Sequence, residues 1–249
     1  MGSMIDAPIG YNAPQLSQSE IEATATYAAK ANWPQGFTLY QRGAAADGVF
    51  IVLRGRIVLR SRVKAGRGFV PMVATRGETF GTEGLARAGC YVTDARADEP
   101  SETLHLSGAR FRAFVREQPQ QALSLVGQVM AEHSLLLEKL RELATLSVEQ
   151  RLVSTLLRMA HQHTFTADDG RITLDATQYR LLCEMVGATR ESVSLVLARL
   201  VGDGLAVRKG TTYVIAPAAE LMERLGHQWR ESEIALPTAR EMGDGRIAL

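Results

Sequence analysis

The stretch TQYRLLCEMVGATRESVSLVLARL, residues 177–200, decides the fold of the C-terminal part of the chain. Two short helical patterns flank Gly187, a layout typical of a helix-turn-helix. Gly187 suits the left-handed conformation that ends a helix, and Thr189 can cap the next helix; Thr177 or Gln178 is the expected cap of the first. The apolar positions follow helical spacing and should be buried: Leu182, Met185 and Val186, then Val193, Val196, Leu197 and Leu200.

The opposite face of the second helix carries groups suited to reading a base sequence. This face presents Arg190, Glu191, Ser194, Leu195 and Ala198. Arginine can donate a bidentate pair to guanine O6 and N7, and glutamate can accept from cytosine N4. The pattern predicts a helix that reads the major groove of DNA. The plain alternative is a solvated helix start with two ordinary charges.

The composition fits a folded chain with two domains, since 46% of its 249 residues are hydrophobic and its net charge is +1. Any affinity for DNA must therefore come from a local patch. Two separated cysteines, Cys90 and Cys183, exclude a disulfide framework and a four-cysteine metal site, and we expect no metal. The chain shows no apolar run of about 18 residues and no signal-peptide pattern, so we expect a cytoplasmic protein without a membrane partner.

The N-terminal half changes from helical to β-rich texture. Ser17 or Ser19 can cap a helix that runs to about Asn32. Short β-rich runs separated by glycine-bearing turns follow, which predicts a barrel or sandwich. The predicted strands are 37–40, 49–53, 56–62, 69–74 and 102–106, with a short helix at 111–115.

A long helical run extends from Pro119 to about Leu146. Its apolar residues recur at steps of 3, 4 and 7: Leu125, Val129, Leu136, Leu140 and Leu143. This spacing is close to a coiled-coil seam and predicts a dimer helix. The alternative is a helix that is buried against its own domain.

Two hairpins and two helices are predicted around the helix-turn-helix. Residues 148–162 and 219–226 read as helices, and residues 164–175 as a hairpin that turns at Asp169-Gly170. A second hairpin, 205–215, turns at Lys209-Gly210 directly after the reading helix and so predicts a wing. The wing residues that can contact phosphate are Arg208, Lys209 and Thr211.

The order of elements predicts an α+β fold: a sensor barrel at 17–117, a dimerisation helix at 118–147 and a winged helix-turn-helix domain at 148–226. Residues 1–16 look like a tag with a flexible N-terminus, and residues 227–249 like a flexible tail.

From about residue 32 to residue 215 the chain resembles the CRP/FNR family of bacterial transcription regulators. Gly77-Glu78-Thr79-Phe80-Gly81 is similar to the family's GDxxG turn. The segment from Gly187 to Ser194 is similar to the family's G-x-[ST]-R-E-[TS]-V recognition segment, and Gly43 and Gly55 keep its turn spacing. The resemblance implies a cyclic-nucleotide-binding-like jelly-roll barrel and a homodimer. It also implies an inverted DNA repeat with TGTGA-type half-sites, and double-stranded DNA and RNA polymerase as partners.

The resulting DNA-contact set comprises Thr189, Arg190, Glu191, Ser194, Leu195, Arg208, Lys209 and Thr211. Leu195 departs from the arginine that relatives often place there. That departure lends slight support to another class of protein, a ligand-binding module whose DNA-binding face has lapsed.

The positions that hold cyclic AMP in the family carry other residues here. The family places a glutamate after the glycine of the turn, an Arg-Ser pair on the cyclic phosphate, and a Thr and a Ser of the long helix on the purine. This chain has Thr82-Glu83, Tyr91-Val92 with Arg87-Ala88 nearby, and Leu136-Leu137. A buried phosphate without a cation would be poorly paired, so the usual cyclic AMP binding is not expected.

What remains is an effector pocket predicted from Thr82, Glu83, Cys90, Tyr91, His133, Leu136 and Leu137. The alignment places His133 one turn before the purine-contacting positions, where it is expected to face the barrel. Haem or redox sensing through His133 or Cys90 is one interpretation. A second interpretation is that His133 is a core histidine and Cys90 a small apolar residue. A third is a regulator that needs no effector. No cofactor is assigned.

An enzyme is not expected. The five histidines, at positions 105, 133, 161, 163 and 227, lie in no G-x-S-x-G, HExxH or P-loop pattern, and no such pattern occurs elsewhere in the chain. The favoured hypothesis is a sequence-specific DNA-binding regulator.

Overall fold

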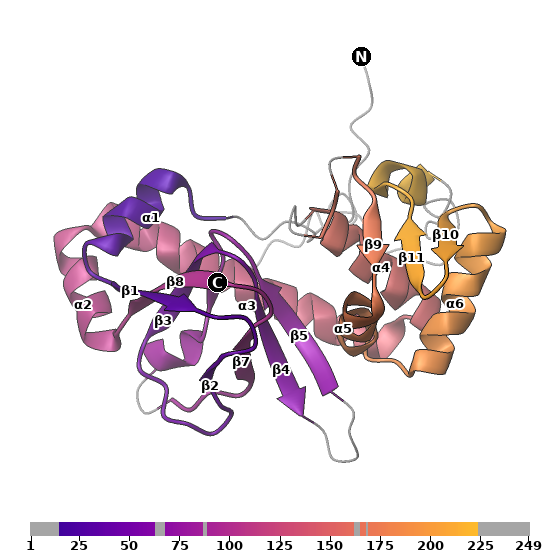
Figure 1. Ribbon diagram of the computed structural model, residues 1–249. Helices are drawn as coiled ribbons and strands as arrows, with labels where there is room; N and C mark the ends of the chain where they lie inside the picture. The colour runs from indigo at the N-terminus through magenta and orange to yellow at the C-terminus, as the bar shows by residue number, and fades with distance from the viewer. Residues whose placement is uncertain (1–14, 63–67, 87–88, 162–164, 168, 224–249) are drawn as a thin grey trace, which may run out of the picture.

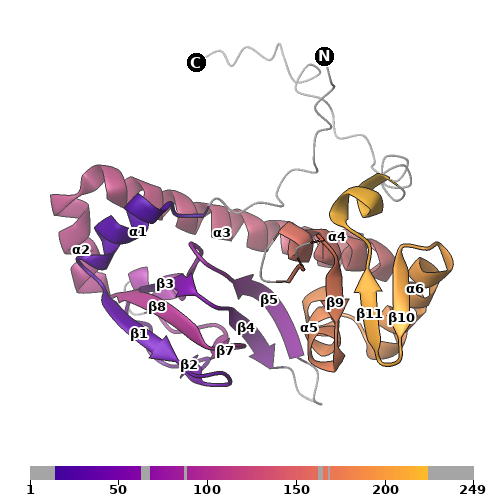
Figure 2. The same ribbon diagram turned by 45° about the horizontal axis from the view of Figure 1, so that its top comes forward.

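The computed structural model describes residues 15–62, 68–86, 89–161, 165–167 and 169–223. A β-domain and a smaller, mainly helical domain lie side by side, as Figure 1 shows. The long helix α3 (Pro119–Thr145) runs along the β-domain and on to the second domain, as Figure 2 shows. No helix within the described ranges is long and apolar enough to cross a membrane.

The β-domain is a jelly roll of two antiparallel sheets with four strands each, which confirms the predicted fold class. One sheet has the order β1 (Ala29–Trp33), β8 (Ser101–Leu106), β3 (Val49–Arg54) and β6 (Thr79–Phe80). The other has the order β2 (Thr38–Tyr40), β7 (Asp94–Ala97), β4 (Ile57–Arg62) and β5 (Gly68–Ala74). Strands β1, β6 and β7 were not predicted.

The first helix is shorter than predicted. Helix α1 (Gln18–Ala25) begins with a capping box, in which Ser17 accepts from the Glu20 amide and the Glu20 carboxylate accepts from the Ser17 amide. The prediction of a helix to Asn32 is wrong because residues 29–33 pair with β8 as strand β1. Pairing with a distant strand outweighs the weak local preference for helix.

Two apolar clusters fill the β-domain. Between the sheets, Tyr40, Phe50, Phe80 and Tyr91 pack together, with the rings of Tyr40 and Tyr91 stacked at a centroid distance of 3.6 Å. On the outer side of β3 and β8, a second cluster covers these strands with α1, α2 (Gly108–Glu117) and the start of α3. Leu125 belongs to this second cluster and is fully buried.

Helix α3 buries several polar side chains and exposes several apolar ones. Its buried side chains include four polar or charged residues: Gln128, Glu132, Lys139 and Glu142. Its exposed apolar side chains are Leu123, Val126, Met130, Leu136, Leu137 and Leu140. Seven of the helix positions that face away from the β-domain repeat at steps of three and four: 123, 126, 130, 133, 137, 140 and 144.

The predicted dimer seam therefore needs a correction. Leu125 is wrong as a seam residue because its side chain is 0% exposed and fills the protomer's own core. Val129 and Leu143 are partly buried, whereas Leu136 and Leu140 are exposed, Leu140 to 63%. Steps of three and four occur on both faces of α3, so spacing alone joined residues from two faces.

A buried ion pair fastens α3 to α4 (Val148–His161). The carboxylate of Glu142 accepts from Arg158 Nη1 at 2.6 Å and Nη2 at 2.9 Å, and from the Ser154 hydroxyl. Burial alone would raise the pKa of Glu142, but the bonds and charge of Arg158, with Ser154 and Lys139, hold it below its ordinary value. Arg151 adds bonds from α4 to the carbonyls of Leu146 and Val186.

The second domain is a winged helix-turn-helix, as predicted. Its remaining elements are β9 (Ile172–Leu174), α5 (Ala176–Val186), α6 (Arg190–Gly202), β10 (Ala206–Lys209) and β11 (Thr212–Ile215), and residues 218–223 are helical. The hairpin predicted at 164–175 is a single bridge, Thr166 with Ile172, because β9 pairs mainly with β11. Outside the described residues lie positions 1–14 of the predicted tag, positions 164 and 168 of the predicted hairpin, and positions 224–249, which include the predicted tail.

The two domains share a core and an ion pair. Val58, Val70 and Val73 of β4 and β5 pack into the apolar cluster of the second domain. Beside them Arg60 donates to Glu184 of α5, with distances of 2.6 Å and 3.0 Å. The first helix of the helix-turn-helix is therefore held by the jelly roll as well as by its own domain.

Candidate functional site

The turn between α5 and α6 has the geometry that its sequence predicts. Gly187 adopts the left-handed conformation with φ 66°, and its amide donates to the Cys183 carbonyl. The Thr189 hydroxyl accepts from the Ser192 amide and caps α6. The predicted cap of α5 is wrong, since Asp175 accepts from both the Thr177 and Gln178 amides. A carboxylate there accepts from two backbone amides at the start of the helix and is stabilised by the positive end of the helix dipole.

The outer face of α6 is exposed, and its inner face anchors it. All four predicted anchor residues are buried: Val193, Val196, Leu197 and Leu200. Arg190, Glu191, Ser194 and Leu195 are exposed, Leu195 to 67%. The structure thus brings the predicted reading residues to one accessible surface at the start of a capped helix.

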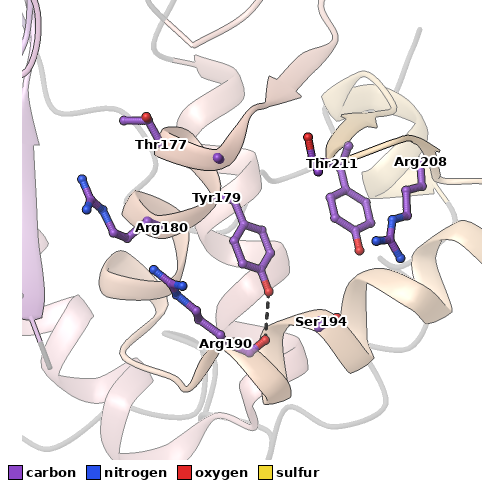
Figure 3. Close-up of a pocket in the computed structure, with 9 residues that line it drawn as sticks. Thr177, Tyr179, Arg180, Arg190, Ser194, Arg208 and Thr211 are labelled. Atoms are coloured by element: carbon purple, nitrogen blue, oxygen red, sulfur yellow. Dashed lines mark hydrogen bonds between the residues drawn. The ribbon is translucent and has the colours of Figure 1, made fainter. Parts of the chain in front are cut away.

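A groove of about 530 Å³ lies between α5, the start of α6 and the wing (Figure 3). Three arginines from three elements line it: Arg180 of α5, Arg190 of α6 and Arg208 of β10. This is the local cationic patch that a chain of net charge +1 needs in order to bind DNA. The other lining residues are Ala176, Thr177, Tyr179, Ser194, Thr211 and Tyr213.

Thr177, Tyr179 and Arg180 also belong to this surface, although they were not predicted from the sequence. Their only signal was their position on the polar arc of the first helix of the motif. Tyr179 donates from its hydroxyl to the Arg190 carbonyl at 2.9 Å, a contact drawn in Figure 3. Such a contact depends on how α5 and α6 pack, which the spacing of residues does not reveal.

The wing carries its predicted side chains on the surface. Arg208, Lys209 and Thr211 are all exposed, and Gly210 turns the hairpin with φ 62°. The guanidinium of Arg208 lies 5.6 Å from the centre of the Tyr213 ring, and its Nε donates to the Gly210 carbonyl. Arg208 is therefore oriented by the wing itself.

In the jelly roll, the predicted effector pocket is only partly assembled. Thr82 and Glu83 lie in a short 3₁₀ helix (Thr82–Leu85) that follows β6. The Glu83 carboxylate accepts from the Val92 amide at 3.1 Å. Tyr91 is buried in the aromatic cluster, while Cys90 is exposed. Arg87 and Ala88 lie outside the described residues.

The helix residues assigned to this pocket point elsewhere. His133 is exposed, and the expectation that it faces the barrel is wrong. Leu136 is 38% exposed and Leu137 54% exposed. The buried neighbour of His133 is Glu132, whose carboxylate accepts from the Thr79 hydroxyl of β6. Within the described residues, His, Cys, Asp and Glu side chains form no group of three that could hold a metal.

Glu132, on the inner face of α3, has a strongly raised pKa. Burial raises its pKa to about 8, against the opposing effect of the Thr79 hydrogen bond. The charges of Glu83 and Glu78 raise the pKa further. The side of the jelly roll that faces α3 is therefore rich in carboxyl groups.

Comparison with known proteins identifies this architecture. The model of the cyclic nucleotide-binding domain matches residues 30–118, and that of the Crp-like helix-turn-helix domain matches residues 150–225. A jelly roll of this kind joined to such a helix-turn-helix defines a DNA-binding transcription regulator. The chain belongs to the CRP/FNR family, whose members are transcription regulators and not enzymes.

The relatives cover most of the chain at low identity. The cAMP-activated global transcriptional regulator CRP of Salmonella typhimurium is 26% identical over 185 residues, 74% of this chain and 87% of the relative. A CRP-like cAMP-activated global transcriptional regulator of Mycobacterium tuberculosis is 23% identical over 211 residues, 84% and 93% of the two chains. The c-di-GMP responsive global regulator CLP of Xanthomonas campestris shares the fold, with a TM-score of 0.67 at 22% identity over 80% of this chain and 99% of that one.

Substitution of Glu132 by glutamine should change how stability depends on pH. The folded-state pKa of about 8 lies above the ordinary value of 4.5. The contribution of Glu132 to the free energy of unfolding is therefore fully present below about pH 4.5 and is lost as the pH rises toward 8. At pH 9, Glu132→Gln should be more stable than wild type by at least about 1.4 kcal/mol, the equivalent of one pKa unit. At pH 5 the gain should largely vanish.

Urea unfolding at both pH values and at one protein concentration measures this difference. Glu138→Gln is the matched control, because Glu138 lies on the same helix in a largely exposed pair with Arg141. Parallel stability–pH curves for wild type and Glu132→Gln would contradict the assignment.

Proposed function

We propose that the protein is a homodimeric transcription regulator that reads an inverted DNA repeat, with a sensor jelly roll that lacks the usual contacts to cyclic AMP. The observation that carries the proposal is the outer face of α6, where Arg190 and Glu191 begin an exposed, capped helix beside a groove lined by arginines. RNA polymerase is a further proposed partner, because the family acts on transcription.

The start of α6 supplies the base contacts. Arg190 donates to guanine O6 and N7, and Glu191 accepts from cytosine N4 on the opposite strand, which suits a TGTGA-type half-site. Leu195 has no hydrogen-bonding group and instead contacts a thymine methyl. The base pair that an arginine would read there is therefore relaxed or changed.

The phosphate contacts flank the base-reading face. Lys209 and Arg208 of the wing lie on one side, and Arg180 of α5 on the other side of the groove. Thr177 and Thr211 add hydroxyl donors. Side chains of these types fix the register of a protein on DNA without specifying sequence.

The dimer forms along the outer face of α3. This face carries a series of exposed apolar side chains that only His133 interrupts, while Glu132, Lys139 and Glu142 of the same helix are buried inside the protomer. A soluble helix that exposes leucines at heptad spacing needs a partner, and a second copy in parallel supplies the same face. Gly127 lies beside the series, and a Cβ there would meet nothing within 4 Å among the described residues, which leaves room for a close approach.

The jelly roll does not suit an anionic nucleotide in the usual pose. Glu83 holds the Val92 amide, at the place where the family binds a phosphate, and Glu132 and Glu78 add carboxyl groups nearby. Tyr91, stacked on Tyr40, occupies part of the interior. A cyclic phosphate would meet carboxylates and aromatic rings in place of an arginine. The chain therefore shares the architecture of its cAMP-activated relatives but is not expected to bind their ligand.

A charge in the α3 stripe should separate the dimer. Leu140→Asp would place an uncompensated carboxylate in a buried seam, and sedimentation at micromolar concentration should show a monomer. Val92→Asp, which changes an equally exposed apolar residue of the jelly roll, should leave the dimer intact. A wild-type protein that is already monomeric under these conditions and still binds DNA tightly would refute the dimer.

Two alanine variants should separate base reading from phosphate contact. Arg190→Ala should cost about 1–3 kcal/mol per half-site and loosen the preference at one guanine. Lys209→Ala should weaken binding to all sequences alike and lower the salt slope by about one. The measurement is a binding series over single-base variants of the site. If Arg190→Ala lowered the affinity equally for every single-base variant of the site, Arg190 would contact a phosphate and not a base.

Calorimetry with cyclic AMP should detect no tight binding to the wild-type protein. The reason is the set of carboxyl and aromatic side chains that replaces the phosphate and purine contacts. Micromolar or tighter affinity would overturn this account of the sensor jelly roll.

A further inference from the structure

Tyr179 joins the three parts of the DNA-binding surface. It lies on α5 with its side chain half-buried, and its hydroxyl points to the first residue of α6, as Figure 3 shows. The hydroxyl donates to the Arg190 carbonyl at 2.9 Å. Burial raises the pKa of Tyr179 to about 12, and its ordinary value of about 10 already leaves the hydroxyl protonated at neutral pH.

The ring of Tyr179 reaches the wing. It stacks against Tyr213 of β11 with a centroid distance of 6.2 Å and an interplanar angle of 19°. The guanidinium of Arg208 also lies against the Tyr213 ring. One side chain of α5 thus contacts both the backbone of the base-reading residue and the ring that supports the phosphate-binding residue of the wing.

The Arg190 carbonyl does not need Tyr179 for its own satisfaction. In an α-helix this carbonyl accepts from the amide four residues later, that of Ser194. A bond from Tyr179 is therefore a second bond to the same oxygen, and its loss leaves no buried group unpaired. The bond from Tyr179 holds the first turn of α6 at a fixed distance from α5 and the wing.

We propose that Tyr179 is a positioning residue for sequence recognition, which keeps Arg190 in register with the phosphate contacts of the wing. The inference rests on the proposed function, because it concerns how that surface discriminates among sequences. Tyr179 itself carries no base contact in this account. It acts through the backbone of Arg190, so the hydroxyl affects discrimination and the ring supports the wing.

The test uses Tyr179→Phe, which keeps the ring and removes the hydroxyl. A high-affinity duplex is first selected from a random pool by the wild-type dimer. Affinities are then compared for this duplex, for the variant that changes the base pair read by Arg190, and for an unrelated duplex, each at two salt concentrations. Tyr27→Phe is the matched control, because it removes a tyrosine hydroxyl that donates to Glu117 at 2.9 Å in the other domain.

Tyr179→Phe should lower the ratio of selected to variant affinity by about 2- to 12-fold per half-site, the range expected for one hydrogen bond. Affinity for the unrelated duplex and the salt slope should not change, because no charge is removed. The thermal midpoint should also stay unchanged, which a merely structural role would not allow. Tyr27→Phe should keep the wild-type ratio.

Two results would overturn the inference. One is an unchanged ratio in Tyr179→Phe, and the other is an equal loss of affinity for all three duplexes, as expected of a phosphate contact or a fold defect. If the wild type shows no preference among duplexes, the proposed function fails and the inference fails with it. The wild-type measurement thus separates the two failures.

Discussion

Helix α3 is constrained from both sides, because it buries charged side chains against its own chain and leaves a leucine-rich face to solvent. The buried carboxylate of Glu142 is compensated by Arg158 and Ser154 of α4 and by Lys139 of α3 itself. Removing one partner of a buried ion pair typically costs about 3–5 kcal/mol. The pair therefore fixes the start of the second domain relative to the long helix. The outer face needs an apolar partner, which the proposed dimer supplies.

The helix-turn-helix is also attached to the jelly roll away from α3. The Arg60–Glu184 pair and the apolar contacts of β5 hold α5 directly. Gly187 shows how close this packing is: its φ is positive, and a Cβ there would lie 3.1 Å from the Leu143 side chain and 3.6 Å from Phe69. The glycine that ends α5 thus serves the backbone turn and the contact between domains together. The orientation of α6 depends on this junction as much as on the core of its own domain.

The helix-turn-helix was predictable because its signals are local. A glycine in the left-handed conformation, a threonine cap and four apolar residues at helical spacing lie within a few turns, and the structure confirms each of them. The family resemblance and the jelly roll were likewise visible in turn motifs. Strand β1 was not, since its pairing with β8 joins residues about seventy positions apart.

The errors on α3 have one physical origin. Glu132, Lys139 and Glu142 are of types that usually lie in water, yet they are buried here beside partners from other elements. Neither the apolar spacing that placed Leu125 in the seam nor the family pattern that placed His133 toward the barrel identifies the buried face of such a helix. Tyr179 and Arg180 escaped notice for a related reason, because their roles depend on the packing of α5 against α6 and the wing.

The central claim is that two α6 helices, related by a two-fold axis, read one DNA site together. The direct test measures wild-type affinity for duplexes that carry two inverted half-sites, with the spacing between their centres varied in steps of one base pair. The account predicts a sharp optimum near one helical turn, about 10–11 base pairs, and a strong loss when half a turn is added. Affinity that does not depend on spacing, or that equals the affinity for a single half-site, would contradict it.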